Sequence, residues 1–247
     1  MADRGISPRV SGAVDLGSAS KAWRKVYAGR IDEGTYIPGA FNKKVTYTSS
    51  GSFTAPVTGT YKITLQGGGG GGSGAGTVSG IHLAGSGGGS GAHITTYERL
   101  TAGTSYAYIV GAGGAGSTAG ASSSQSSDGT SGGATTITIG SNSYSAGGGV
   151  HAYGSGTYAR PGKGGSATLN GQNIPGSGFP GGAGSTTSSI NAPGGSGGGA
   201  GGAEVGWVAS VYGGGGGGGQ IGSDGIYGDG GAGGDGYITF EYYDTNA

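Results

Sequence analysis

The sequence contains no cysteine, so it can form no disulfide and has no thiol nucleophile or cysteine-based zinc site. It is also poor in residues of an ordinary hydrophobic core, because Leu, Ile, Val and Phe together number only 34 of 247 residues. Charged residues make up 10% of the chain, and the formal net charge is 0. These shortages disfavour a helical bundle and a doubly wound α/β enzyme, and the neutral total gives no indication of a nucleic-acid partner.

Motifs for catalysis and for metal binding are missing as well. No segment approaches the roughly 18 consecutive apolar residues of a membrane span, so no membrane insertion is expected. The three histidines lack metal-ligand spacing, and no Ser-His-Asp arrangement can be identified. Gly-x-Gly-x-x-Gly recurs, but matches are expected by chance at this glycine frequency, and none lies between a strand and a credible helix. The sequence therefore predicts a protein that is not an enzyme, with no metal site and no cofactor.

Glycine is what the chain has in abundance, with 69 residues. It would weaken any helix by about 1 kcal/mol at each position relative to alanine. Collagen is excluded, because the glycine period is not strict and only seven prolines are present. The 15 tyrosines and several β-branched runs argue against a disordered chain. Flexible linkers between strands remain the main alternative for the glycine runs themselves.

The chain divides into two parts of different composition, residues 1–40 and 41–247. Residues 1–44 hold eight of the twelve Lys and Arg residues, and a short helix could begin in the first part at Ser18 or Ser20. Four apolar residues of this segment have no obvious partner within it, namely Leu16, Trp23, Val26 and Tyr27. We therefore expect them to form the interface of a homotrimer.

In the second part, alternation of apolar and polar residues predicts strands. Segments 44–54 and 59–66 are separated by the turn sequence Ala55-Pro56-Val57-Thr58-Gly59, so we expect them to pair. Asn170-Gly171 is the strongest hairpin signal. Further strands are expected at 93–98, 105–110, 134–139, 143–146, 166–169 and 237–243.

Between the strands lie glycine runs, several of which have a period of three, as in residues 230–236. Three residues per turn is the period of polyproline II, which forms no hydrogen bonds within itself. Glycine rods of this kind can pack side by side and bond to one another. The expected fold is therefore mostly β and irregular: a small layer of strands plus packed polyglycine II rods joined by loops.

If the strands gather at one end, alternate rods run outward and return, which assigns the connecting loops to the far end. These loops are 77–83, 117–131, 150–161, 185–193 and 220–227. The densest group of side chains able to stack or donate hydrogen bonds lies in residues 150–161. The candidate binding residues at this end are His82, His151, Tyr153, Tyr158, Arg160 and Tyr227. Trp207, which the same reasoning places at the near end as a packing residue, is their main rival.

Three segments resemble known sequences. Leu16-Gly17-Ser18, Trp23 and Val26-Tyr27-Ala28-Gly29 resemble a motif of tailed-phage tail fibres. The segment from Gly51 to Gly70 and the strand Gly236–Phe240 resemble the opening and the closing of the glycine-rich domain found at fibre ends. The rod arrangement is similar to the polyglycine II sandwich of the tip adhesins of T-even-like phages, in which far-end loops bind outer-membrane proteins or sugars. Residues 1–40 differ from those adhesins, since they carry fibre-like sequence where the adhesins have a separate attachment domain.

This resemblance implies a trimeric fibre end over residues 1–40 and a glycine-rich receptor-binding domain over residues 41–247. The expected function is that of a tail fibre tip adhesin on the virion, joined to the rest of the tail fibre and recognising a host bacterial surface receptor. Two alternatives stay open: a purely structural cap of the fibre end, and an ice-binding glycine-rich protein. The fibre-like residues 12–29 argue against the second.

Overall fold

The structure is a computed structural model that describes residues 41–120, 127–154, 160–184, 186–187, 194–199, 209, 212–223 and 225–244. The predicted segment 1–40, with Leu16, Trp23, Val26 and Tyr27, lies outside the described residues, as do Tyr158 and Trp207. The described residues form strands and extended backbone without a helix, which confirms the mostly β fold class. It follows that none of the described residues belongs to a helix long and apolar enough to span a bilayer.

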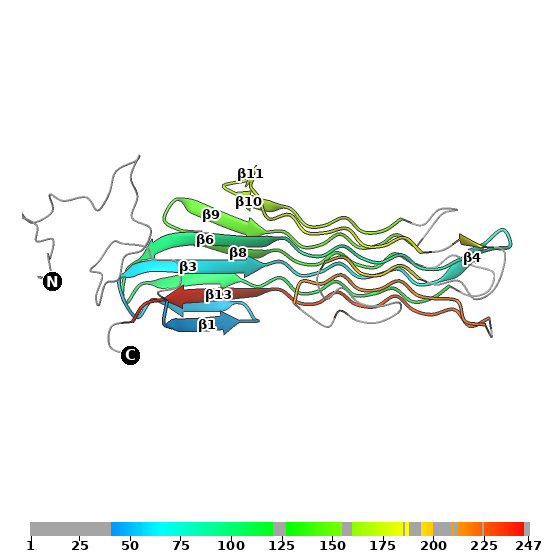
Figure 1. Cartoon of the computed structure of the whole chain (residues 1–247), viewed down its shortest axis with the longest axis horizontal. Coiled ribbons are helices and arrows are strands. Elements are labelled where there is room, and N and C mark those ends of the chain that lie inside the picture. The colour runs from blue at the N-terminus through cyan, green and yellow to red at the C-terminus, as the bar shows by residue number, and fades with distance from the viewer. Residues whose placement is uncertain are drawn as a thin grey trace, which may run out of the picture. The chain divides into compact units, whose positions relative to one another are not determined.

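The strands form three antiparallel sheets. The first has the order β1 (Lys43–Tyr47), β13 (Tyr237–Tyr242), β3 (Gly59–Gln66), β6 (His93–Leu100). The second has the order β11 (Gln172–Asn173), β10 (Ala167–Leu169), β9 (Asn142–Ala146), β8 (Thr135–Ile139), β7 (Ser105–Ile109), β2 (Gly51–Thr54). These two sheets lie together at one end of the rods (Figure 1). The third, with the order β12 (Thr186–Thr187), β5 (Ile81–Leu83), β4 (Gly76–Val78), lies at the other end.

The alternation of apolar and polar residues located most of these strands within one or two residues. The Asn170-Gly171 hairpin is confirmed: it joins β10 to β11, and both turn residues have positive φ, 50° and 78°. Such a turn requires left-handed backbone at both central positions, which asparagine and glycine tolerate best. Residues 77–83, expected as a loop, instead contain the β4–β5 hairpin, whose turn residues Ser79 and Gly80 have the same signature.

The predicted pairing of segment 44–54 with segment 59–66 is wrong. The first segment is broken by a bend at Thr48-Ser49-Ser50, so β1 and β2 are separate strands in different sheets. β1 pairs with β13, which lies between β1 and β3, and β2 pairs with β7. Alternation marks the apolar side of a strand and leaves its partner undetermined, because any strand with a matching apolar side satisfies it.

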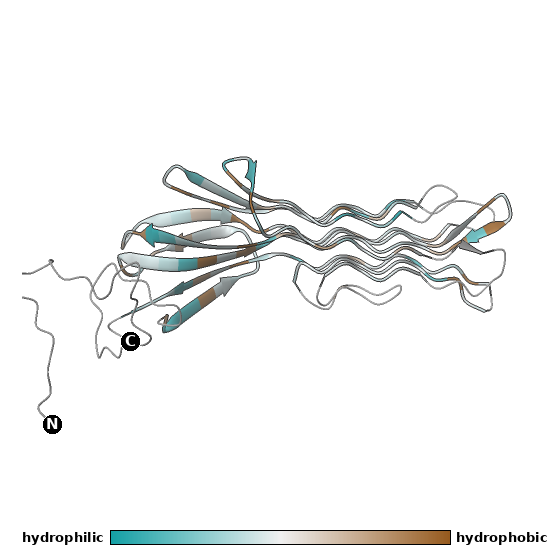
Figure 2. Cartoon of the chain, turned by 45° about the horizontal axis from the view of Figure 1, so that its top comes forward, coloured by the Kyte–Doolittle hydropathy of each residue, from teal (hydrophilic) through white to brown (hydrophobic). Residues whose placement is uncertain are grey.

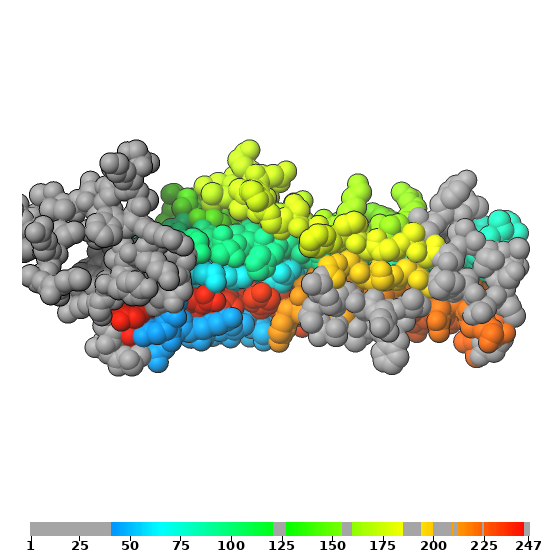
Figure 3. Space-filling view, viewed as in Figure 1, coloured from blue at the N-terminus to red at the C-terminus, as the bar shows by residue number. Residues whose placement is uncertain are grey.

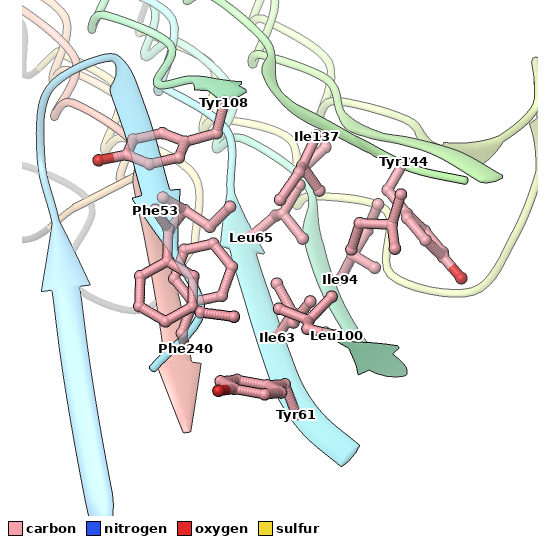
Figure 4. Packing of buried hydrophobic residues seen from close by; sticks show 14 of the residues in the cluster. Phe53, Tyr61, Ile63, Leu65, Ile94, Leu100, Tyr108, Ile137, Tyr144 and Phe240 are labelled. Atoms are coloured by element: carbon pink, nitrogen blue, oxygen red, sulfur yellow. The ribbon is translucent and has the colours of Figure 1, made fainter. Parts of the chain in front are cut away.

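The hydrophobic core lies between the first two sheets (Figure 4). Phe53 of β2 stacks on Phe240 of β13, with ring centroids 4.1 Å apart and an interplanar angle of 14°. A polar contact joins the same sheets, since the Tyr144 hydroxyl of β9 donates to Glu98 Oε1 of β6 at 2.5 Å. Figure 2 shows the same division by colour: the strands carry the strongly hydrophobic and hydrophilic residues, and the rods are mostly pale.

Ten rods run between the strand layer and the other end within the described residues (Figure 1). Their atoms are in continuous contact in the space-filling view (Figure 3). In chain order the rods are 67–75, 84–92, 111–120, 127–134, 147–154, 160–166, 176–184, 194–199, 213–220 and 227–236.

Rod 67–75 shows how the bundle is bonded. Its successive N–H groups donate to three neighbouring rods in rotation, with a period of three: Gly67 to Ala92, Gly68 to Gly133, Gly69 to Gly234, and then Gly70 to Gly89, Gly71 to Thr130 and Gly72 to Gly231. Its carbonyl groups accept from three further rods, those that begin at Gly111, Gly147 and Gly213. Rod 67–75 therefore has six neighbours and is completely buried. Ordered bonds of this kind contradict the flexible-linker interpretation of these runs.

Glycine is required in the rods because the backbones approach too closely for a side chain. A Cβ added at Gly69 would lie 1.8 Å from the carbonyl oxygen of Gly214, and one at Gly233 would lie 2.2 Å from that of Gly69. The core of this half of the protein is thus hydrogen-bonded backbone in place of packed side chains. This explains how a chain with so few large apolar residues folds.

The outer rods carry side chains at every third residue, and these face solvent. The exposed positions with this period are Ala112, Ala115 and Thr118 in one rod, Ser177, Pro180 and Ala183 in another, and Arg160, Lys163 and Ser166 in a third. Phe179 is exposed as well, outside this period. Side chains on outer rods also satisfy donors of neighbouring rods. Asp235 Oδ1, for example, accepts from the N–H of Gly113 at 2.8 Å. The outward side chains end the lateral growth of the bundle, because another rod cannot approach them closely.

Candidate functional site

Two of the candidate binding residues, His82 and Tyr227, meet at the end opposite the strand layer. Rod 67–75 leaves β3 and leads into β4, so the β4–β5 hairpin lies at that end (Figure 1). Thr77 and His82 are register partners on the hairpin. The Tyr227 hydroxyl lies 2.7 Å from Thr77 Oγ1 and 2.8 Å from His82 Nδ1. We call Thr77, His82 and Tyr227 the tip cluster.

The tip cluster is built on a small apolar base. Ala75, Ala84 and Ile221 are buried together, and Tyr227 packs against them. Ile221 and Tyr227 also form an isolated β-bridge, which holds the Tyr227 ring beside the hairpin. The Tyr227 hydroxyl thus faces both Thr77 Oγ1 and Nδ1 of His82. The cluster therefore offers a fixed hydrogen-bonding edge on a stiff support.

Two exposed isoleucines flank the tip cluster in the sequence, and the sequence analysis did not select them. Ile81 is 39% exposed and Ile226 is 66% exposed. Each directly precedes a cluster residue. Exposed apolar side chains next to fixed polar groups are typical of protein contact surfaces. A sequence signal could have identified both: each is an isoleucine in a segment predicted to be a loop, where a large apolar side chain is not expected to be buried.

A second group of candidates, His151, Tyr153 and Arg160, meets on the rods. The rings of His151 and Tyr153 have centroids 4.6 Å apart, and the Arg160 guanidinium carbon lies 5.0 Å from the centre of the Tyr153 ring. Ser131 Oγ lies 2.9 Å from His151 Nδ1. We call His151, Tyr153 and Arg160 the lateral cluster.

The lateral cluster is set by the period of the rods. Val150 donates to Lys163 and Tyr153 donates to Arg160, so rods 147–154 and 160–166 run side by side in a fixed register. Asp128 Oδ1 accepts from the N–H of Gly154 at 2.8 Å and so helps to hold the end of the first rod. A cation over the face of a tyrosine ring contributes about 0.5–1 kcal/mol at an exposed site.

The structure does not bring the two clusters to the same level. Ala152 donates to Gly71, and Ala75 donates to Gly228. The lateral cluster therefore lies beside Gly71 and Gly72, about 10 Å short of the level of Ala75 at 3.1 Å per residue. The expectation that all candidates share the far end needs correcting. His82 and Tyr227 lie at the tip, whereas His151, Tyr153 and Arg160 lie on the side of the rods. Tyr158 is outside the described residues.

The described residues contain no group of three or more His, Cys, Asp or Glu side chains that could hold a metal ion. Among the histidines, His93 of β6 has a lowered pKa, because burial disfavours its charged form and Lys62 lies nearby. Both clusters present aromatic rings and hydrogen-bonding groups.

A comparison with family models finds a match to the model described as a glycine-rich domain, over residues 46–243. The match runs from β1 to the end of β13 and includes every rod and both clusters. The curated proteins compared with the chain contain no match.

Proposed function

This chain belongs to the glycine-rich domain family, and from that premise we propose that it is the receptor-binding tip of a tailed-phage tail fibre. The fibre-like motif that contains Trp23 and Tyr27 is what supports the fibre assignment. In this proposal residues 1–40 form the trimeric end of the fibre, and the glycine-rich domain recognises a surface receptor of the host bacterium. The protein then acts on the virion, at the distal end of the fibre.

The observation that carries the proposal is the contrast between stiff rods and the few large side chains on them. Rods bonded to their neighbours lose little conformational entropy when a receptor binds, because their backbone is already ordered. Five of the six candidate binding residues fall into the tip and lateral clusters. Tyrosine, histidine and arginine supply stacking and hydrogen bonding on a background of Gly, Ser and Ala. Such a surface suits recognition, and nothing in it indicates catalysis.

Adsorption to host cells tests the proposal. Tyr153→Ala combined with Tyr158→Ala should abolish adsorption of the labelled protein, since loss of one interface hot spot typically costs 2 kcal/mol or more of binding free energy. The melting temperature of this variant should be unchanged. The matched control removes two tyrosines that are exposed in the strand layer, Tyr97 and Tyr243. This control should adsorb normally.

Two results would contradict the proposal in different ways. If neither the parent protein nor any variant adsorbs to any host tested, the domain is a structural cap of the fibre end. If Trp207→Ala abolishes adsorption while the double tyrosine variant adsorbs normally, the receptor site lies elsewhere in the domain.

A further inference from the structure

The only cations that follow Arg99 in the sequence are Arg160 and Lys163. Both are exposed, and both lie on rod 160–166, three residues apart. Since this rod has three residues per turn, the two side chains project from the same face, with Cα atoms about 9 Å apart. The described residues place no carboxylate within ion-pair distance of either cation. Asp128, the only acidic residue between Thr101 and Ala203, accepts a hydrogen bond from Gly154.

Each of the two outer rods beside rod 160–166 carries an exposed aromatic residue. Tyr153, on rod 147–154, lies under the Arg160 guanidinium and is 37% exposed. Phe179 lies on the rod on the opposite side and is 65% exposed. Gly178 donates to Gly165 and Gly181 donates to Gly162, which places the backbone of Phe179 alongside Gly164, on the rod next to that of Lys163. We call Tyr153, Arg160, Lys163 and Phe179 the cation ridge.

The exposure of the Phe179 side chain is not explained by a role in folding. It is one of the most exposed large apolar side chains among the described residues, and it projects from a rod whose other outward residues are Ser177, Pro180 and Ala183. Its backbone is already satisfied, because its N–H donates to Ser90 Oγ and its carbonyl accepts from the N–H of Ser90. A phenylalanine this exposed contributes little to the bundle and offers a flat apolar face to a ligand.

We infer that the cation ridge binds an acidic glycan, a sugar chain that carries carboxylate or phosphate groups, lying along the rods. Sugar rings present flat C–H faces that pack on Phe179 and on the exposed part of the Tyr153 ring, and the acidic groups pair with the guanidinium and the ammonium. The spacing of the two cations is comparable to the length of a disaccharide, so acidic groups that recur along the chain reach both. This inference takes its biological meaning from the proposed receptor-binding function, whose receptor class it narrows.

An acidic peptide is the main competing ligand, and the surface favours it less. A peptide that adds to a protein as a strand needs an open backbone edge. In rods 147–154 and 160–166, backbone groups next to the ridge are already bonded to neighbouring rods. The cation ridge supplies positive charge and flat rings. An acidic glycan contacts both, whereas a poly-glutamate chain pairs with the charges and has no ring to stack. Poly-glutamate is therefore the probe that separates the two.

The test measures binding of the full chain to purified polymers by calorimetry. The probes are polygalacturonate and its neutral methyl ester, phosphomannan and its dephosphorylated mannan, and poly-glutamate. We expect one of the two acidic glycans to bind at least about tenfold more tightly than its neutral counterpart and than poly-glutamate. The acidic polymer that binds identifies carboxylate or phosphate as the recognised group. Binding should weaken as NaCl is raised, because the pairs are exposed.

Three variants locate the site. Arg160→Gln combined with Lys163→Gln should weaken binding of the acidic glycan about tenfold or more and remove most of its salt dependence. Phe179→Ala should weaken binding without changing the salt dependence. The matched control, Lys43→Gln with Lys44→Gln, removes the same charge from the exposed residues of β1 and should bind like the parent protein.

The inference is overturned if the control loses as much affinity as the Arg160 and Lys163 variant, if that variant binds like the parent, or if poly-glutamate binds equally well. Should the Arg160 and Lys163 variant fail to fold, the Phe179 variant and the salt series decide the matter. Failure here is distinguishable from failure of the proposed function. A protein that adsorbs to cells but binds no acidic polymer keeps its function and loses this site. One that binds the polymer but adsorbs to no host retains the site and loses the function.

Discussion

At the scale of single residues, the protein depends on positions where a side chain is forbidden and on a few where a polar side chain is buried. Rod glycines lie in direct contact with backbone carbonyl groups of neighbouring rods. In the strand layer, Tyr61 is completely buried, and its hydroxyl donates to the carbonyl of Val57 at 2.8 Å. The first kind of position tolerates no added methyl group, and the second tolerates no added charge.

We predict that Gly69→Ala strongly destabilises or unfolds the domain, because the new Cβ would lie 1.8 Å from the carbonyl oxygen of Gly214. Thermal unfolding measures this effect. Gly59→Ala is the matched control, since nothing lies within 4 Å of its Cβ position, and its effect should stay within about 0.5 kcal/mol. Equal melting temperatures for the two variants would mean that rod 67–75 is not close-packed in solution.

Alkaline pH should destabilise the strand layer through Tyr61. Burial raises the pKa of Tyr61 to about 12, above its ordinary value of 10.0. The folded state therefore holds this proton more tightly than the unfolded state does. The resulting stabilisation is complete below pH 10 and is lost as the pH rises toward 12. Denaturant unfolding at several pH values should show this decline. Tyr61→Phe, which carries no ionisable group, should show a smaller one; an identical decline would assign the effect to other tyrosines.

At the scale of elements, strands and rods are stabilised by different interactions. Strands bury every second side chain between two sheets, as Phe53 and Phe240 show. Rods bury backbone on several sides and expose every third residue when they lie at the edge of the bundle. A rod therefore tolerates substitution according to a period of three, where a strand follows a period of two.

Two neighbouring positions of rod 111–120 test this period. Gly114→Ser should destabilise the domain severely, because a Cβ there would lie 1.9 Å from the carbonyl oxygen of Thr130. Ala115→Ser introduces the same residue at an exposed position and should change the free energy of unfolding by less than about 0.5 kcal/mol. The measurement is urea unfolding of both variants. If Ala115→Ser lowers the free energy of unfolding as much as Gly114→Ser does, Ala115 does not face solvent as described.

At the scale of the whole molecule, the described domain has two ends of different character. The strand layer holds the hydrophobic core, and the rods extend from it to the β4–β5 hairpin (Figure 1). The tip cluster lies at that far end, and the lateral cluster and the cation ridge lie along the rods. Under the proposed function, the two kinds of surface meet a receptor at the tip and along the side.

Assembly of the full chain is a prediction at this scale. We expect a homotrimer held by residues 1–40, and light scattering should give a mass about three times the 23.2 kDa of one chain. Trp23→Ala should weaken the trimer, since loss of a buried tryptophan costs roughly 3–5 kcal/mol. A change outside that segment, Ile226→Ala, serves as the control and should leave the mass unchanged. A mass of 23.2 kDa for the intact chain would contradict the trimer.

Much of the architecture follows from the sequence alone, because it depends on local patterns. Alternating residues define the strands, the Asn170-Gly171 pair defines a hairpin, and glycine with a period of three defines the rods. The candidate site was predicted as residue types on loops: a histidine, tyrosines and an arginine close together in a bare region. Arg160 was expected in the loop 150–161, and only the structure places it on one rod with Lys163.

Only the tertiary structure decided which elements are neighbours. Gly69 bonds to Gly234 and Gly114 bonds to Gly69, yet the N–H of one glycine is chemically identical to that of any other, so nothing in the sequence specifies these pairs. The same holds for the separation of β1 from β2, and for the different levels of the tip and lateral clusters. Phe179 became a candidate only when its rod was placed beside Lys163. The period of a segment is determined by its own residues, whereas its partners are determined by the packing of the whole chain.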